Sequence, residues 1–159
     1  MRRAFLLFGT RFTVHANHED TAGKYDLVEG SASPSFRTPL HRHTRYAEQF
    51  YVLEGEFTVW AGERMAVLYP GDVFTIPIGT VHAVAVTGSG PARAVVVATP
   101  SGFARLIMEA GTPDTDGAPP AGPPDVALFE RICAEIGDEI LGPPGALPEE
   151  RSPCRFAGA

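Results

Sequence analysis

Three histidines and one glutamate carry the clearest chemistry in this sequence: His41, His43, Glu48 and His82. Neutral imidazole nitrogens and a carboxylate oxygen are donors that divalent transition metals accept in proteins. These residues come from two separate segments, so they can meet only if the chain folds back on itself as a compact β-structure. The pattern predicts a metal site with three nitrogen donors and one oxygen donor, and with positions left for water, dioxygen or substrate.

The first segment, residues 38–55, supplies three of the four donors. Residues two apart on a strand point to the same face, about 6–7 Å apart, so His41 and His43 can lean toward one ion. Glu48 comes five residues after His43, an odd offset that would place it on the other face of a straight strand. We therefore expect residues 44–47 to turn and Glu48 to open the neighbouring strand.

The second segment, residues 70–82, ends on His82 and contains Pro77 and Gly79, which favour a tight turn. A barrel would bring the strand of His82 opposite the first pair of histidines. An isolated His-x-His pair is more often structural or exposed than metal-binding. The glutamate and the third histidine, both in glycine-bounded segments, favour the metal site over that interpretation.

Bulk properties exclude several other classes of function. The formal net charge is −6 and the 13 basic residues are scattered, which argues against a nucleic-acid partner. The apolar run at residues 4–9 is too short for a signal peptide, and no run approaches the length of a membrane span. Two cysteines, Cys133 and Cys154, do not make a disulfide framework. We therefore expect one cytoplasmic domain with no membrane partner.

The order of elements predicts an all-β fold. Short β-prone runs are separated by glycine, proline or small polar residues, and many short strands at close spacing favour a sandwich or a small barrel. The predicted strands cover residues 5–8, 11–15, 25–30, 48–53, 57–60, 65–68, 73–76, 81–86 and 92–98.

The composition changes after residue 110. Residues 111–124 are rich in proline and glycine and are predicted to be a loop. An amphipathic helix follows, with Asp125 as its N-cap and Gly142 at its end. Its apolar stripe consists of Val126, Phe129, Cys133, Ile136 and Ile140. We expect residues 125–159, helix and tail, to pack on the same domain as residues 1–110.

The two metal-donor segments resemble the two conserved motifs of the cupin family. In the first, His41-x-His43 is followed by four residues, Glu48, six residues and Gly55. In the second, Gly71 is followed by five residues, Pro77-x-Gly79, two further residues and His82. Fifteen residues separate the motifs, which is typical of the minimal spacing. Two positions depart from the pattern, Ser35 for the usual leading glycine and Val86 for a frequent asparagine, and neither is a usual metal ligand.

Nearly the whole chain resembles the small single-domain bacterial cupins grouped with quercetin 2,3-dioxygenase. The resemblance is carried by residues 6–10, 19–30, 48–57, 91–111 and 135–144. It implies a cupin barrel, a double-stranded β-helix or jelly roll, over residues 1–110, with a short C-terminal α-helix. A frequent Asp-Glu pair of the group is Ala47-Glu48 here, which removes a second carboxylate and suggests a different substrate.

The resemblance implies one divalent transition metal, with Ni, Fe, Mn, Co, Cu and Zn all compatible with the four ligands. A dioxygenase acting on a flavonol or another phenolic or enolic small molecule is the first hypothesis. Glu48 would then be both a metal ligand and a catalytic proton acceptor. The alternatives are a non-redox cyclase, isomerase or lyase that tailors a polyketide-like product, and a small-molecule-binding cupin without catalysis. Cupins of this size often pair through edge strands, so we expect a homodimer.

Other side chains have simpler interpretations. His15 and His18 are expected to be exposed loop residues rather than ligands. Tyr46 is expected to be a core or rim aromatic, with a gate over the pocket as the alternative. A third group alternates along the predicted strands and could line an apolar cavity or fill the core: Phe50, Phe74, Ile76 and Val84.

Overall fold

The computed structural model describes residues 3–115 and 122–148. Two antiparallel sheets contain all twelve strands of these described residues. The larger sheet has the order β11-β1-β2-β3-β10-β5-β8, with β11 at Thr112–Pro113, β1 at Arg3–Leu7, β2 at Thr10–Ala16, β3 at Asp26–Ala32, β10 at Ala92–Thr99, β5 at Ala47–Glu54 and β8 at Val73–Ile76. The smaller sheet has the order β12-β4-β9-β6-β7, with β12 at Asp138–Pro144, β4 at Pro39–His43, β9 at His82–Val86, β6 at Phe57–Ala61 and β7 at Arg64–Leu68.

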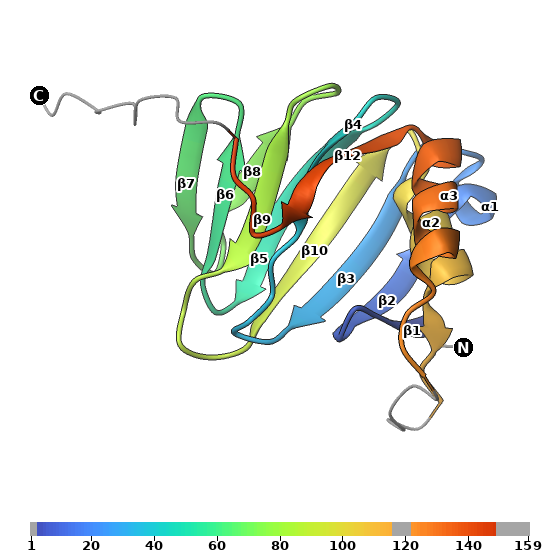
Figure 1. Cartoon of the computed structure of the whole chain (residues 1–159), viewed down its shortest axis with the longest axis horizontal. Coiled ribbons are helices and arrows are strands. Elements are labelled where there is room, and N and C mark those ends of the chain that lie inside the picture. The colour runs from blue at the N-terminus through green and yellow to red at the C-terminus, as the bar shows by residue number, and fades with distance from the viewer. Residues whose placement is uncertain (1–2, 116–121, 149–159) are drawn as a thin grey trace, which may run out of the picture.

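Three helices accompany the sheets: α1 at His18–Thr21, α2 at Phe103–Ala110 and α3 at Val126–Ile136. In Figure 1, α2 and α3 lie together at the end of the molecule that holds β1 and β2, and β7 lies at the opposite end. Among the described residues, none of the helices combines the length and hydropathy needed to span a bilayer.

Alternation of buried and exposed side chains explains the strands next to the candidate site. In β5, Glu48, Phe50 and Val52 are buried while Gln49 and Tyr51 are exposed, which is the period of two expected of a strand with one covered face. The expectation that Glu48 shares its face with Phe50 and Val52 is confirmed. Glu48 therefore points between the sheets, into the interior of the protein.

A tight turn sets the start of β9. Gly79 has a φ of +79°, a left-handed conformation that glycine adopts without steric cost. The Thr80 amide donates to the Pro77 carbonyl, and the Gly79 amide donates to the His43 carbonyl at 2.7 Å. The turn is thus tied directly to the end of β4, which brings His82 next to the first two histidines.

The C-terminal helix is shorter than the sequence pattern predicts. Asp125 caps α3 as expected, because its side chain accepts a hydrogen bond from the Leu128 amide. The helix ends at Ile136, however, because Gly137 adopts a left-handed conformation with φ of +85°. The prediction that the helix continues through Ile140 to Gly142 is wrong, since these residues belong to β12.

Two further elements lie outside the predicted strands and helix. These are the short strand β11, which pairs with β1 within the loop predicted over residues 111–124, and helix α2; the short helix α1 was not expected either, since His18 was expected in a loop. Cys133 is buried on the inner side of α3, as predicted. Cys154 and the last part of the predicted tail lie outside the described residues.

Candidate metal centre

His41 and His82 lie directly opposite one another on neighbouring strands of the smaller sheet. The register of β4 and β9 pairs His41 with His82, and their ring centroids are 4.1 Å apart. The strand of His82 thus lies opposite the first pair of histidines as expected, and it does so as a hydrogen-bonded neighbour of β4 in the same sheet. The residue that comes from the other sheet is Glu48, on β5.

The three imidazoles converge on one point. One ring nitrogen from each of His41, His43 and His82 lies within 4.8 Å of those of the other two. Glu48 Oε2 is 3.3 Å from His43 Nε2 and 3.4 Å from His82 Nε2. Donors that share one ion at about 2.0–2.1 Å lie roughly 3 Å apart, so these separations suit a common metal.

Each imidazole is held through its other nitrogen. His41 Nδ1 donates to the Pro39 carbonyl at 2.8 Å, and His82 Nδ1 donates to the Thr80 carbonyl at 2.9 Å. His43 Nδ1 is 2.7 Å from a carboxylate oxygen of Asp138. Because Nδ1 carries the proton in each of these contacts, Nε2 is the nitrogen of each ring that faces the shared point and is left to bind a metal.

Burial makes the cluster costly unless something binds it. His82 is fully buried, and its Nε2 has no hydrogen-bond partner among the described residues. An unsatisfied buried polar atom costs about 1–3 kcal/mol. A cation held by the three imidazoles and Glu48 would satisfy this nitrogen, so the donor set fits a divalent transition metal.

The charges of the cluster are strongly coupled. Burial, with the nearby His82 and His43 rings, lowers the pKa of His41 to about 3. Burial would also lower the pKa of His43, but Glu48 and Asp138 outweigh it and raise that pKa to about 9. Burial would raise the pKa of Glu48, yet His43 and His82 hold it well below its usual value. In the metal-free site, Glu48 is a carboxylate facing a protonated His43.

Two residues next to the cluster were not assigned to it from the sequence. Asp138 is buried at the start of β12 and was placed in the predicted helix. Tyr46 is 1% exposed, stacks on the His43 ring at 4.3 Å between centroids, and donates its hydroxyl to Asp138 at 3.0 Å. Tyr46 is thus a core aromatic, which excludes the alternative of a gate over the pocket.

The cluster opens into a cavity of about 540 Å³, whose lining includes all four predicted ligands. This volume is within the range of small-molecule sites. Seven of the ten phenylalanines in the sequence line the cavity: Phe8, Phe12, Phe36, Phe50, Phe57, Phe103 and Phe129. The four alternating residues expected either to line a cavity or to fill the core all belong to the packed core, and two of them, Phe50 and Val84, also line the cavity.

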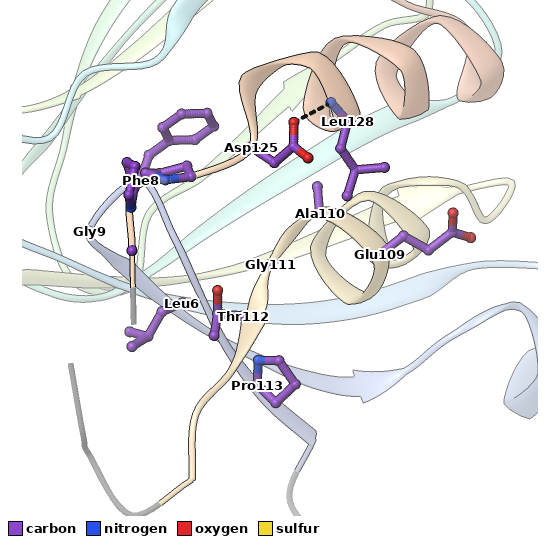
Figure 2. A pocket seen from close by; sticks show the side chains of 13 residues that line it. Leu6, Phe8, Gly9, Glu109, Ala110, Gly111, Thr112, Pro113, Asp125 and Leu128 are labelled. Carbon is purple, nitrogen blue, oxygen red and sulfur yellow. Dashed lines mark hydrogen bonds between the residues drawn. The ribbon is translucent and has the colours of Figure 1, made fainter. Parts of the chain in front are cut away.

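A second, smaller hollow lies beside β1 and α3. Figure 2 shows this groove of about 300 Å³, with Phe8 and Gly9 on one side and Asp125 hydrogen-bonded to the Leu128 amide on the other. The described residues that line it include no histidine. The predicted surface histidines are also elsewhere, since His15 contacts Glu29 on the outer face of the larger sheet and His18 contacts Ser101.

Residues 30–98 match the family model of the cupin domain. This range contains all four residues of the cluster, and the surrounding architecture of two antiparallel sheets is that of solved cupin structures. Residues 30–98 form a cupin domain. The fold and the family predicted from the two motifs are therefore confirmed.

Several known cupins are similar to this one. Quercetin 2,3-dioxygenase from Bacillus subtilis (strain 168) is 30% identical over 121 residues, which is 76% of this chain. The match spans only 35% of that enzyme's length. The polyketide cyclase RemF from Streptomyces resistomycificus is 26% identical with a TM-score of 0.55, covering 63% of this cupin and 75% of RemF. KdgF from Halomonas sp. shares the fold. It is 20% identical with a TM-score of 0.56, covering 63% of this chain and 88% of KdgF.

Proposed function

We propose that this cupin is a metal-dependent enzyme acting on a planar aromatic or enolic small molecule, with a quercetinase-like dioxygenase reaction as the first candidate. The observation that carries the proposal is a cluster of His41, His43, His82 and Glu48, of which all but His41 are buried, in the wall of a cavity lined by phenylalanines. The relationship to quercetin 2,3-dioxygenase supports the reaction class. In a binding protein without catalysis, the same carboxylate would serve only as a metal ligand.

In this proposal the three imidazoles and Glu48 hold one divalent ion, with Ni, Fe, Mn, Co, Cu and Zn as candidates. When bound, such an ion is a Lewis acid that lowers the pKa of a phenol or enol oxygen. Glu48 is the proposed catalytic residue. Its lowered pKa keeps the carboxylate ionised, so it is able to accept the proton that a substrate hydroxyl gives up.

The cavity wall would select the substrate by shape and polarity. Phe50 and Phe57 contact one another edge to face, with ring centroids 4.9 Å apart, and both line the cavity. Aromatic walls of this kind favour flat, apolar ring systems and exclude water from the reacting atoms. A flavonol and an aromatic polyketide both have this shape.

A non-redox reaction on a polyketide-like substrate is the second candidate. It is favoured by the likeness to the polyketide cyclase RemF. In this alternative the same residues bind and deprotonate an enol, and dioxygen has no part in the reaction. We also retain a cytoplasmic location and a homodimer as predictions from the sequence.

Oxygen dependence separates the two candidates. The protein would be loaded with one metal at a time and supplied with quercetin, or with an aromatic polyketide, in air and under nitrogen. A dioxygenase consumes quercetin and dioxygen in equal amounts and stops under nitrogen. Equal turnover with and without dioxygen, especially with zinc, would contradict the dioxygenase and support the second candidate.

A further inference from the structure

The strand β12 lies outside the matched cupin region, yet it runs beside the metal-site strand β4. Its first residue, Asp138, is paired in register with His43. The turn before it is clamped in place, because the Gly137 carbonyl accepts hydrogen bonds from both the amide and the hydroxyl of Thr44. A side chain at Gly137 would collide with Thr44 and Arg45, which keeps the chain close to β4 at this point.

Both carboxylate oxygens of Asp138 accept hydrogen bonds at the imidazole of His43, one from the ring itself and one from the aromatic residue stacked on it. Oδ1 accepts the Nδ1 proton of His43 at 2.7 Å, and Oδ2 accepts the hydroxyl proton of Tyr46 at 3.0 Å. The Tyr46 ring stacks on His43 with 23° between the ring planes. All three side chains are buried. The hydrogen bond to Asp138 fixes the His43 ring within its plane, and stacking against Tyr46 covers one face of the ring.

His43 differs in this respect from the other two histidines. His41 and His82 donate their Nδ1 protons to neutral backbone carbonyls within their own segments. Only His43 donates to a carboxylate, which comes from 95 residues further along the chain. A carboxylate partner fixes the tautomer more strongly than a carbonyl and increases the donor strength of the opposite nitrogen.

We propose that Asp138 is a positioning residue of the metal centre, so that α3 and β12 complete a site whose ligands all lie in the cupin motifs. This inference rests on the proposed metal centre. Asp138 holds the Nδ1 proton of His43, aims Nε2 at the shared point between the imidazoles, and strengthens it as a donor. The competing explanation is structural: Asp138 would only join α3 and β12 to the rest of the fold.

A cobalt titration distinguishes positioning from a structural role. The affinity for Co²⁺ would be measured by competition with a chelator, and the Co²⁺ absorption spectrum would report the geometry of the ligands. The variants are Asp138→Ala, Asp138→Asn and Tyr46→Phe, each compared with wild type. The thermal stability of each metal-free variant would be recorded to separate folding from binding.

Glu139→Ala is the matched control. Glu139 is the next residue on β12 and forms an ion pair with Arg42 across the same pair of strands, but on the exposed face. This variant perturbs the attachment of β12 to β4 without touching His43. It should bind Co²⁺ as wild type does.

We expect Asp138→Ala to weaken Co²⁺ binding by roughly 10–100-fold and to change the absorption spectrum, as is typical when a partner of a metal-bound histidine is removed. Asp138→Asn should fold even if the alanine variant does not, because it has the same shape. It should bind several-fold more weakly than wild type, and Tyr46→Phe should have a smaller effect.

Two results would overturn the inference while leaving the metal site intact. One is wild-type affinity and an unchanged spectrum in Asp138→Asn or in a folded Asp138→Ala. The other is an equal loss of affinity in Glu139→Ala, which would indicate a purely structural role. Failure of the wild-type protein to bind Co²⁺ would instead contradict the proposed function itself, together with this inference.

Discussion

His41 and His82 face one another across a single register position between β4 and β9, with their ring centroids 4.1 Å apart. Neither strand alone could hold an ion, since β4 supplies His41 and His43 and β9 supplies only His82. The pairing of the two strands makes the cluster, and Glu48 closes it from the other sheet. The account predicts how this cluster responds to protons, metal and substitution.

Metal binding should release protons from His43. Its pKa of about 9 means that it is protonated at pH 7.5 in the metal-free protein, and it must lose this proton to coordinate. His41, with a pKa of about 3, is already neutral and contributes none. Calorimetric titration in buffers of different ionisation enthalpy should give about one proton released by His43 per metal bound.

The raised pKa of His43 also sets the pH range over which metal affinity falls. An unperturbed histidine predicts that affinity falls only below about pH 6.5. The raised pKa of His43 moves the onset of the loss to about pH 9. Proton release near zero at pH 7.5 would contradict the raised pKa.

The stability of the metal-free protein should be greatest near pH 6.5. Between pH 6.5 and about 9 the folded state binds the His43 proton more tightly than the unfolded chain does, so the free energy of unfolding falls as the pH rises. Below pH 6.5 His41 of the unfolded chain takes up a proton that His41 of the folded protein does not bind, so the free energy of unfolding falls as the pH drops. The lowered pKa of Glu48 adds to this decrease in the free energy of unfolding at acidic pH.

Urea denaturation of chelator-treated protein from pH 5 to pH 10 would measure this profile. His43→Gln should abolish most of the decline on the alkaline side. A free energy of unfolding that rises steadily from pH 6.5 to pH 9 in the wild type would be inconsistent with the assignment.

Removing the metal should lower the melting temperature. A ligand that binds only the folded state stabilises it, by about 2.7 kcal/mol when its free concentration is 100 times Kd. Thermal unfolding before and after EDTA, and again after adding back metal, checks this. The loss should be reversible and should be absent in His82→Ala. A shift of equal size in that variant would mean that the metal binds elsewhere.

A larger side chain in the cavity should block substrate binding without affecting metal binding. Val84 is two residues after His82 on β9 and lines the cavity. Val84→Phe should reduce kcat/KM for an aromatic substrate by at least about tenfold, which corresponds to 1.4 kcal/mol of lost transition-state binding. Val67→Phe, at an exposed position of β7, is the control for added bulk. Unchanged kcat/KM in Val84→Phe would exclude this cavity as the substrate site.

The sequence predicts strands β5, β8 and β10 well because their residues alternate between buried and more exposed positions. Strand β10 is an example, with Ala92, Ala94, Val96 and Ala98 buried and the residues between them partly exposed. The sequence also predicts the residue at which α3 begins, because the cap of the helix, Asp125, is next to it in the sequence. Its end was misplaced because Ile140 continues the helical spacing although Gly137 has already ended the helix.

Helix α2 and Asp138 were missed for a different reason. Gly102, at the start of α2, has no capping side chain, and Asp26, 76 residues away, accepts the hydrogen bond from its amide instead. Asp138 likewise meets His43 across 95 residues. Local patterns carry no information about such contacts. The four predicted ligands could be selected because the spacing of the two motifs reports on distant positions together.

Elemental analysis of freshly purified protein tests the central claim most directly. Wild type and the His41→Ala/His82→Ala double variant would be purified side by side without added metal, and the folded state of each confirmed by circular dichroism. The account predicts about one equivalent of a divalent transition metal in the wild type and almost none in the double variant. Stoichiometric metal in a folded double variant would contradict it.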